Sequence, residues 1–395
     1  MSFSNKKKSK LSENAIVTPG FAFKSTDFGD YGFPVVKIAD INPPRVDLNN
    51  CQRIHPDKVQ GLDKFKLTNG DIVIAMTGAT LGKVGRIKED ITAYLNQRVV
   101  KITNIPTLTD KGFLYYLVTL KENNSKIIEL GLGSAQANFS GKDLENLEFY
   151  FPDLSTQTTI SAILTSIDDK IELNFQTNQT LENLTQAIFK DWFVNFNFPG
   201  ATGEMHDSEL GPIPNGWRVG RLGDIIRNYD SKRIPLSSRE REKRKGTFPY
   251  YGAASIMDYI DDFIFDGTYL LMGEDGTVIT EKDRPVLQYV TGKFWVNNHA
   301  HVIQGGNNFS TEYVYLLLKN TNIKHIITGA VQPKINQANM NELSILCPGL
   351  SVLSNFQSII ASLFLRVLTN EQESIILARI RDDLLPKLMK GEIEV

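Results

Sequence analysis

The stretch "FPDLSTQTTISAILTSIDDKIELN" (151–174) decides the fold, because "CPGLSVLSNFQSIIASLFLRVLTN" (347–370) repeats its design. Pro152 corresponds to Pro348, and Ser155 to Ser351, at a constant shift of 196 residues. In both stretches a proline ends an extended segment, and an apolar run at helical spacing follows it. The matching prolines and the matching spacing of apolar residues predict that the chain contains the same structural unit twice.

The repeat extends upstream of these stretches. At the same shift, "GSAQANFSGKDLENLEFYFP" (133–152) aligns with "GAVQPKINQANMNELSILCP" (329–348). Further upstream the match needs gaps and pairs "NGDIVIAMTGATLGKVGRI" (69–87) with "DGTYLLMGEDGTVITE" (266–281), and "LNQRVVKI" (95–102) with "NNHAHVIQ" (297–304). Such short β-rich runs between glycine and asparagine turns predict the strands of a compact domain that is either irregular β or α+β. One short helix per half is predicted over "GFLYYLVTL" (112–120) and "TEYVYLLLK" (311–319).

Downstream of each proline, apolar residues recur about every 3.5 residues. These seam residues are Ile160, Leu164, Ile167, Ile171, Leu181, Ile188 and Trp192 in the first copy, and Phe356, Ile360, Leu363, Val367, Leu377, Leu384 and Leu388 in the second. Such a long seam predicts a long helix that packs against a helical partner. The alternative is two unrelated helices, each packed on its own domain. A helix of roughly 57 Å exceeds what one small domain needs, which favours the paired helices.

Polar residues interrupt the seam at Asn174 and Asn178, and again at their counterparts Asn370 and Ser374. Single polar residues at core positions of a helix pair fix its register. If the two helices pair antiparallel about their midpoints, Asn174 faces Ser374 and Asn178 faces Asn370. Pro386 is expected to kink or end the second helix near its last turns.

Composition bounds the class of protein. The 395 residues are 41% hydrophobic and 22% charged, as in an ordinary soluble globular protein. No run of about 20 uncharged apolar residues predicts a membrane span, and "MSFSNKKKSK" lacks the apolar core of a secretory signal. Cys51 and Cys347 have no metal-ligand spacing, so a reduced, cytoplasmic protein without a metal site is expected. The net charge of −2 means that a nucleic-acid binder must concentrate its positive charge locally.

These observations predict an α+β fold in which two mixed α/β domains are joined by two long helices that form an antiparallel coiled coil with a pseudo-twofold repeat. The expected boundaries are 1–151 for the first domain, 152–198 for the first long helix and the start of a connector, 199–348 for the second domain, and 349–395 for the second long helix. The connector "FNFPGATGEMHDSELGPIPNGW" (196–217) is rich in glycine, proline and polar residues.

This arrangement resembles the specificity subunit of type I restriction–modification enzymes over nearly the whole chain. The resemblance rests on "GEMHDSELGPIPNGWRVGRLGDI", "FKSTDFGDYGFPVVKIADI", "GSAQANFS" with "LEFYFP", and "LLPKLMKGEIEV". The first half departs from the pattern, because it begins with "SNKKKSKLSEN" and has no counterpart of "GPIPNGW".

The resemblance implies a cytoplasmic protein that binds double-stranded DNA, with two target-recognition domains (1–151 and 199–348) that each read one half of a bipartite, asymmetric sequence. It further implies that the paired helices act as a spacer and carry two modification subunits and, through them, restriction subunits. S-adenosylmethionine, ATP and magnesium would then be bound by those partners, and this chain would need no cofactor. No membrane is implied.

Three stretches suggest catalysis or metal binding and lack what the chemistry requires. "GATLGK" (78–83) has one residue too few for a phosphate-binding loop and no Ser or Thr after its lysine, so a strand-connecting turn is expected. "NPPR" (42–45) has Arg45 where an amino-methyltransferase has an aromatic residue for the flipped base. "HAH" (299–301) lies near no further Cys or His ligand, so its histidines are expected to pack or to make polar contacts on one face of a strand.

The richest basic run, "RVGRLGDIIRNYDSKRIPLSSREREKRK" (218–245), has ten Lys/Arg against four Asp/Glu. Such a run could neutralise DNA phosphates, or it could be a solvated loop. Because Gln and Asn suit adenine edges and Arg suits guanine, other candidates were chosen by residue type and position. Each could equally be a surface, turn or core residue. The predicted DNA-binding residues are Lys83, Arg86, Gln97, Arg98 (these last two on a strand), Gln136 and Asn138 in the first half, and Lys232, Arg233, Lys243, Arg244, Lys245, Tyr250, Tyr251, Lys293, Asn298, His299, Gln332 and Lys334 in the second.

Two rival functions stay open at this point. One is a single-chain methyltransferase or endonuclease with built-in specificity, which the missing motifs disfavour. The other is a coiled-coil scaffold that does not bind DNA, which would need neither elaborate domains nor a local basic run.

Overall fold

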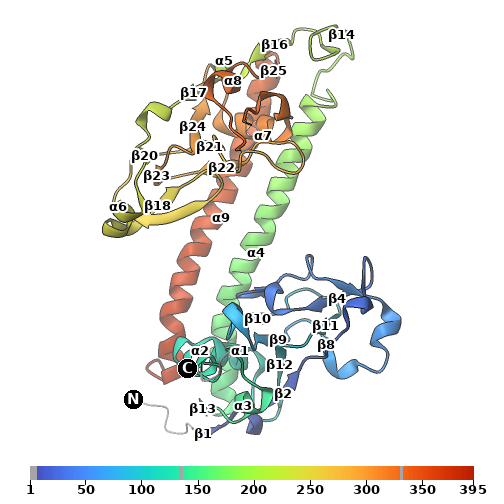
Figure 1. Ribbon diagram of the computed structural model, residues 1–395, viewed down its shortest axis with the longest axis vertical. Helices are drawn as coiled ribbons and strands as arrows, with labels where there is room; N and C mark the ends of the chain where they lie inside the picture. The colour runs from blue at the N-terminus through green and yellow to red at the C-terminus, as the bar shows by residue number, and fades with distance from the viewer. Residues whose placement is uncertain (1–6, 133–136, 330–331) are drawn as a thin grey trace. The chain divides into compact units, whose positions relative to one another are not determined.

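The computed structural model describes residues 7–132, 137–329 and 332–395. The chain divides into two compact units. Unit 1 comprises Met1–Leu173 and Glu373–Val395, and unit 2 comprises Asn174–Gln372. Helix α4 (Leu154–Phe193) and helix α9 (Leu350–Lys390) each contribute one half to each unit (Figure 1).

The two long helices confirm the period read from the sequence. In α4, the Asp153 carboxylate accepts a hydrogen bond from the Thr156 amide (3.0 Å), which caps the start of the helix. At the end of α9, Gly391 adopts a left-handed φ of 70°, and its amide bonds to the Leu388 carbonyl. α9 passes through Pro386 and ends at Lys390, so the proline does not end the helix where it stands.

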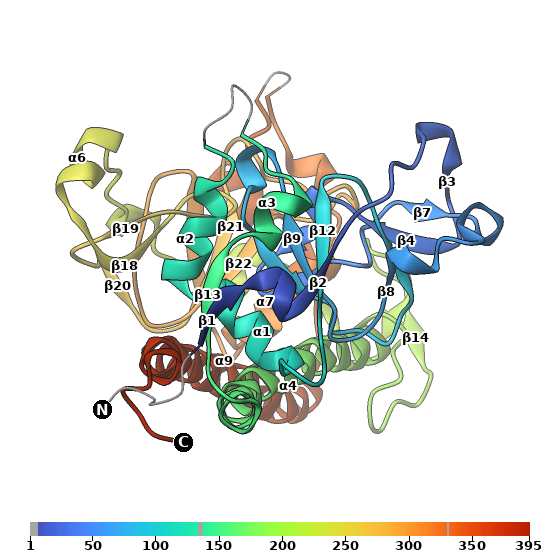
Figure 2. The ribbon, with the colours of Figure 1, turned by 90° about the horizontal axis from the view of Figure 1, so that it is seen from below.

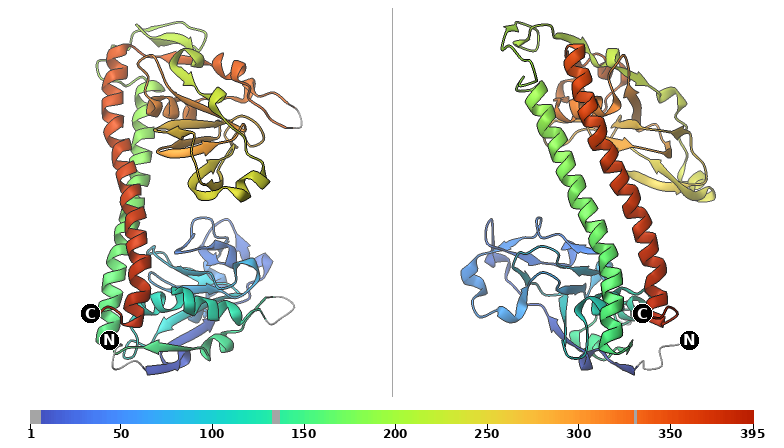
Figure 3. Two further views of the ribbon diagram at one scale, coloured as in Figure 1. Left: turned by 90° about the vertical axis from the view of Figure 1, so that its left-hand side faces the viewer. Right: turned by 180° about the vertical axis from the view of Figure 1, so that it is seen from behind.

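Within each unit the two helices lie side by side and antiparallel (Figure 3). In unit 2 the Asn370 amide donates to Asn178 Oδ1 (2.8 Å), which confirms the predicted pairing of these two residues. Asn178 also donates to the Val367 carbonyl, and Asn174 donates to the Asn370 carbonyl. In unit 1, Arg381 of α9 bonds to Asp168 of α4 (2.9 Å). None of the predicted seam residues is exposed.

Unit 1 holds a six-stranded and a five-stranded sheet. The first has the order β2-β12-β9-β10-β6-β5, the second has the order β3-β7-β4-β11-β8, and the terminal strand β1 pairs with β13. Short helix α1 lies beside the half of α4 that belongs to this unit (Figure 2), and α2 follows α1 directly in the chain. The bounds are β1 Lys7–Lys10, β2 Ala15–Pro19, β3 Phe28–Gly29, β4 Phe33–Val36, β5 Ile41–Asn42, β6 Arg45–Val46, β7 Arg53–Ile54, β8 Lys66–Leu67, β9 Ile72–Ala75, β10 Val84–Arg86, β11 Ala93–Leu95, β12 Val99–Asn104, β13 Glu148–Phe151, α1 Lys111–Thr119, α2 Lys121–Glu129 and α3 Gly141–Glu145.

Unit 2 holds two four-stranded sheets, with orders β17-β24-β21-β22 and β19-β18-β23-β20, and the pairs β16-β25 and β14-β15. The bounds are β14 Met205–His206, β15 Ile213–Pro214, β16 Arg218–Arg221, β17 Ile226–Asn228, β18 Lys245–Tyr251, β19 Ile256–Ile260, β20 Phe265–Asp266, β21 Tyr269–Gly273, β22 Leu287–Val290, β23 Lys293–Val296, β24 Ala300–Gly305, β25 Ser344–Cys347, α5 Leu222–Ile225, α6 Ser238–Lys243, α7 Thr311–Asn320 and α8 Gln337–Asn341.

The same topology recurs in both units, as the sequence repeat predicts. The strand order β2-β12-β9-β10 corresponds to β17-β24-β21-β22, and the pair β1-β13 corresponds to β16-β25. In the second sheet, β4 and β11 run parallel, as do their counterparts β18 and β23. Helices α1 and α7 occupy the two segments predicted to be short helices.

Each unit packs its α/β core onto its own parts of the two long helices. Ile160 and Leu164 of α4 join Leu388 of α9 in the core of unit 1. Phe189 of α4 and Phe356 of α9 join the core of unit 2. By length and composition α9 could cross a membrane, which the sequence reasoning did not foresee. Core helices of soluble proteins pass the same test, and α9 contributes buried side chains to both cores.

Candidate nucleic-acid interface

In each unit, three segments meet at the end of the central strand of the first sheet. We call this meeting point the loop edge: residues 76–78, 97–98 and 137–139 in unit 1, and 274–276, 298–299 and 333–335 in unit 2. In unit 1 the Met76 amide donates to the Arg98 carbonyl (2.9 Å), and the Phe139 amide donates to the Met76 carbonyl (3.2 Å). A third bond runs from the Gly78 amide to the Ala137 carbonyl (3.2 Å).

Unit 2 repeats these three backbone bonds. The Glu274 amide donates to the His299 carbonyl (2.8 Å), and the Ile335 amide donates to the Glu274 carbonyl (2.8 Å). The Gly276 amide donates to the Pro333 carbonyl (3.1 Å). Gly78 and Gly276 both have a left-handed φ, 73° and 78°, which explains a glycine at this position of each turn. The two loop edges therefore share one backbone frame.

The side chains on this shared frame differ between the units. Arg98 of unit 1 corresponds to His299 of unit 2, and Asn138 corresponds to Lys334. All four are exposed, as are Gln97 and Asn298. Gln97 and Arg98 lie in a turn between β11 and β12, so the prediction that they lie on a strand was wrong. His299 lies in the turn before β24, so the prediction that it shares a strand face with His301 was also wrong. The left-handed φ of 67° at Arg98 interrupts the extended backbone that a strand with alternating side chains requires.

Sequence reasoning missed Thr77 and Asp275. Each forms an isolated β-bridge with the third segment of its loop edge, to Asn138 and to Lys334 respectively. Asp275 Oδ1 lies 2.5 Å from Nδ1 of His299. Both residues precede the repeated glycine in the aligned strands, and that shared position is the signal that could have identified them.

Several other predicted residues lie near a loop edge or outside the described residues. Lys83 is exposed in the turn that opens at Gly78, and "GATLGK" is the strand-connecting turn that was expected, between β9 and β10. Gln332 is exposed next to the unit 2 loop edge. Gln136 lies outside the described residues.

Two predicted DNA-binding residues, Tyr250 and Arg86, are buried, and a third, Arg233, is partly buried. Tyr250 is 1% exposed, and its hydroxyl accepts from the Leu236 amide (2.9 Å), so it belongs to the core, which the sequence left open. Arg86 is 8% exposed, with its guanidinium 4.8 Å from the ring of Tyr115. Arg233 is enclosed by carboxylates and carbonyls. The described contacts of these three side chains are all with the protein itself.

Acidic residues that follow the basic run neutralise part of its charge. Lys245 pairs with Asp258 (2.7 Å), and Arg244 pairs with Asp261 (2.9 Å). The "REREKRK" segment contains the short helix α6, capped by Ser237. Of the predicted residues in this region, Lys243 is exposed and no described carboxylate pairs with it. Lys232 lies 5.3 Å from the Tyr229 ring, Lys293 lies 4.5 Å from the Phe263 ring, and Tyr251 packs on Phe294.

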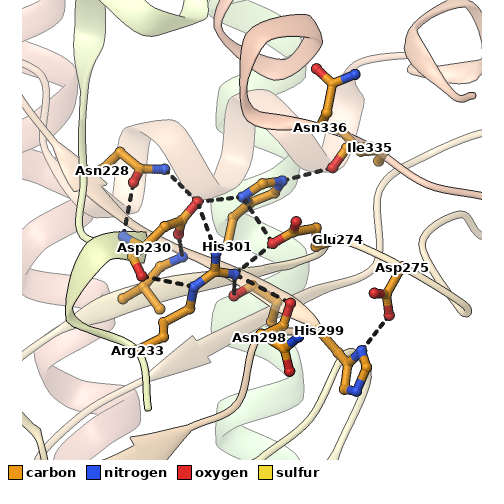
Figure 4. Close-up of polar contacts among 12 residues, drawn as sticks. Asn228, Asp230, Arg233, Glu274, Asp275, Asn298, His299, His301, Ile335 and Asn336 are labelled. Carbon is orange, nitrogen blue, oxygen red and sulfur yellow. Dashed lines mark hydrogen bonds and ion pairs between the residues drawn. The ribbon is translucent and has the colours of Figure 1, made fainter. Parts of the chain in front are cut away.

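A buried ion cluster lies beneath the loop edge of unit 2 (Figure 4). Arg233 Nη1 lies 2.5 Å from Glu274, and His301 Nδ1 lies 2.6 Å from Asp230. His301 Nε2 lies 2.8 Å from the Ile335 carbonyl oxygen, which can only accept a hydrogen bond. Burial opposes ionisation of Asp230, but hydrogen bonds from His301, the Val302 amide and Asn228 outweigh it and lower the pKa of that carboxyl. Both imidazole nitrogens of His301 therefore already face a protein oxygen.

Asp230, Glu274 and His301 place three possible ligand atoms within 4.8 Å of one another. This donor set does not fit a metal ion, because the Arg233 guanidinium already faces both carboxylates and each His301 nitrogen already has a protein oxygen as its partner. The cluster instead supports the loop edge: the side chain of Glu274 binds Arg233, and the backbone of Glu274 forms two of the loop-edge hydrogen bonds.

Comparison with known proteins gives a consistent result. A family profile described as "Type I restriction modification DNA specificity domain" matches residues 4–183 and 214–380. The MjaIX specificity subunit of a type I restriction enzyme from Methanocaldococcus jannaschii is 27% identical over 326 residues, which is 75% of each chain. The HindI specificity subunit from Haemophilus influenzae is 23% identical over 433 aligned positions, covering 88% of this chain and 92% of its own.

A solved structure has the same fold. The S subunit of a type I restriction–modification system from M. genitalium superposes with a TM-score of 0.59 at 18% sequence identity. The superposition covers 97% of this chain and 96% of that one.

Proposed function

Because this chain belongs to the family of type I restriction–modification DNA specificity subunits, we propose that it reads a bipartite, asymmetric DNA target, one half-site per unit. The observation that carries the proposal is the loop edge, built twice on the same three backbone bonds with different exposed side chains. A shared frame gives both units the same docking geometry, whereas different donors and acceptors read different bases. Symmetric dimers, by contrast, repeat one reader and bind palindromes.

The side chains at the two loop edges suit different bases. In unit 1, Arg98 can bond a guanine edge bidentately, and Gln97 and Asn138 can do the same with adenine. In unit 2, the exposed donors and acceptors are His299, Asn298 and Lys334. Lys83 and Lys243, which have no described carboxylate partner, suit phosphate contacts that position the protein without reading sequence.

We further propose that the chain has no catalytic site and docks two modification subunits and, through them, restriction subunits. Those partners would bind S-adenosylmethionine, ATP and magnesium. The incomplete "GATLGK" and "NPPR" motifs and the Arg-filled carboxylate cluster support this division of labour. The scaffold alternative is disfavoured because it leaves the duplicated loop edges without a role.

The experiment co-expresses the chain with its modification subunit and maps methylated bases across a genome. We expect a split motif. Exchanging residues 218–348 for those of a relative should change one half of the motif and leave the other half intact. Methylation by this chain alone would refute the non-catalytic role, and an unsplit motif would refute the bipartite one.

Single substitutions then test the loop edges. Arg98→Ala should relax or abolish recognition in one half-site, and His299→Ala should do so in the other. The lost bidentate contact of Arg98 would reduce discrimination by about 1–3 kcal/mol, whereas His299, whose Nδ1 already faces Asp275, can offer a base one bond. Arg239→Ala, at an exposed position of α6 away from the loop edge, is the matched control. If both loop-edge variants leave the motif unchanged, the bases are read elsewhere.

A further inference from the structure

A cavity of about 300 Å³ in unit 1 is lined mostly by cationic and neutral polar side chains, with one carboxylate, Asp169. Arg86 at the end of β10, Lys111 and Gly112 at the start of α1, and Ser161 and Thr165 of α4 contribute to its wall, together with Lys88. Two of the three cations already have carboxylate partners: Lys88 pairs with Asp169 (3.0 Å), and Lys111 pairs with Asp71 (3.2 Å).

Arg86 is the cation without a partner. Its residue is 8% exposed, yet no described residue accepts a hydrogen bond from its guanidinium. Its described side-chain contact is with the face of the Tyr115 ring, 4.8 Å from the guanidinium carbon. A guanidinium inside a protein normally faces a carboxylate or several carbonyls, because leaving its donors unpaired and out of water is costly. Among the described residues no nitrogen of Arg86 is both fully buried and unpaired, so its free donors are open to solvent in the cavity. The protein therefore presents unused hydrogen-bond donors and an uncompensated positive charge to this cavity.

The start of α1 adds further donors. Asp110 caps the helix by accepting from the Phe113 amide (2.9 Å), whereas the amides of Lys111 and Gly112 have no partner inside the helix. Gly112 lies so close to α4 that a Cβ there would come within 2.1 Å of Ser161 Oγ. The helix start and Arg86 thus line the same cavity, and both favour negative charge.

Unit 2 shows what fills the corresponding place. Strands β9 and β21 are equivalent, and Ile72 of β9 occupies the same place as Leu270 of β21. Arg86 is the strand partner of Ile72, and Tyr289 is the strand partner of Leu270. Tyr289 therefore occupies in unit 2 the position of Arg86 in unit 1. The caps Asp110 and Ser310 align α1 with α7, which puts Glu312 at the position of Gly112. The Tyr289 hydroxyl donates to the Glu312 carboxylate (2.6 Å), and burial together with that bond raises the pKa of Tyr289. Unit 2 therefore supplies, from its own chain, a carboxylate between these two positions.

We propose that the cavity at Arg86 binds a carboxylate that unit 1 lacks, presented by an acidic side chain of a partner subunit. A DNA phosphate is the less suitable anion. Within β10, Val84 lies toward the loop edge and Arg86 lies at the opposite end, opposite Ile72 at the start of β9. The choice of a partner subunit as the source rests on the proposed function, whereas the carboxylate site itself does not.

The first experiment uses the isolated full-length chain and acetate as the probe. Thermal unfolding is followed in sodium acetate and in sodium chloride at equal ionic strength and pH. We expect the wild-type unfolding temperature to be higher in acetate, and Arg86→Met to abolish that difference. Lys142→Met, an exposed lysine of α3, should keep it. An equal acetate response in wild type and Arg86→Met would overturn the site.

The same variant separates the site from a structural role. Replacing an unpaired buried charge with an apolar side chain of similar length should leave the unfolding temperature in chloride unchanged or raise it. If Arg86 only supports the fold through Tyr115, the unfolding temperature of Arg86→Met should fall in both salts. That result would overturn the proposal.

The second experiment tests the source of the carboxylate. The chain is co-purified with its modification subunit at several salt concentrations, as wild type, Arg86→Met and Lys142→Met. We expect Arg86→Met to weaken the complex on the order of thirtyfold, because the partner's carboxylate is left unpaired. An acetate response with unchanged assembly would assign the site to a free anion and overturn the partner assignment. Failure of the DNA-reading proposal would leave both measurements unaffected.

Discussion

Tyr250 illustrates how one side chain can be assigned to the wrong surface from sequence. Its neighbours are basic, but its ring is enclosed and its hydroxyl bonds to the Leu236 amide. We expect Tyr250→Phe to lower the free energy of unfolding by about 1 kcal/mol, the usual worth of such a hydrogen bond. DNA affinity of the assembled complex should not change. Urea unfolding and a binding titration test both expectations, and a loss of affinity without loss of stability would return Tyr250 to the interface.

Asp230 gives a residue-scale prediction for pH. Its folded-state pKa lies below the ordinary value, so its ionisation stabilises the fold above the unfolded-state pKa of about 3.9. That contribution is lost as the pH falls through the lower, folded-state pKa. Asp230→Asn should therefore be less stable than wild type at pH 7, with the difference shrinking below about pH 4. Urea unfolding across this range measures it, and a difference independent of pH would contradict the assignment.

At the scale of elements, the asparagines of α4 and α9 set the register of the helix pair in unit 2. Cysteines at positions 178 and 370, introduced as Asn178→Cys and Asn370→Cys, should cross-link under mild oxidation because the two side chains meet at 2.8 Å. Asn178→Cys combined with Thr369→Cys is the matched control, since Thr369 is exposed on the outer face of α9. Gel electrophoresis after proteolysis between the helices reports the bond. Equal cross-linking of both pairs would contradict a fixed register.

The basic run shows why an element's charge depends on its neighbours. Asp258 lies on the partner strand of β18, and Asp261 follows that strand directly, so the hairpin brings carboxylates onto the lysine and arginine of the run. Exposed pairs of this kind contribute little to stability, but they reduce the positive charge available to DNA. Asp258→Asn and Asp261→Asn together should strengthen DNA binding by the complex and steepen its salt dependence. An unchanged salt slope would place DNA away from α6.

At the scale of the whole molecule, the two ends of the chain belong to one unit. Leu388 of α9 is 1% exposed in the core of unit 1, with residues such as Phe113 and Ile160. Leu388→Ala should destabilise unit 1 by about 2–5 kcal/mol. Hydrogen exchange should then rise in β12 and α1 of unit 1 more than in β24 and α7 of unit 2. Lys387→Ala, exposed on the same turn, is the control. Equal loss of protection in both units would show that they unfold as one.

The repeat, the two long helices and the Asn178–Asn370 pairing could be predicted from the sequence. These features depend on the periodicity of apolar residues and on a constant shift of 196 residues between the two copies. Both can be recognised in the sequence without knowing which distant residues are in contact. The residue types of Arg98, Asn138 and His299 made them candidates, but the sequence placed Arg98 and His299 on strands and not in the turns where they lie.

Tertiary structure alone decided which polar side chains are exposed. Arg86, Arg233 and Arg98 are all arginines that the sequence marks equally as candidates for DNA contact. In the structure Arg86 lies against the Tyr115 ring, and Arg233 is paired with Glu274. The loop edge itself joins three segments that are far apart in sequence, and the ion cluster beneath it joins Asp230 to His301 across 71 positions. Burial and charge pairing depend on neighbours brought together by folding, so no local pattern in the sequence can report them.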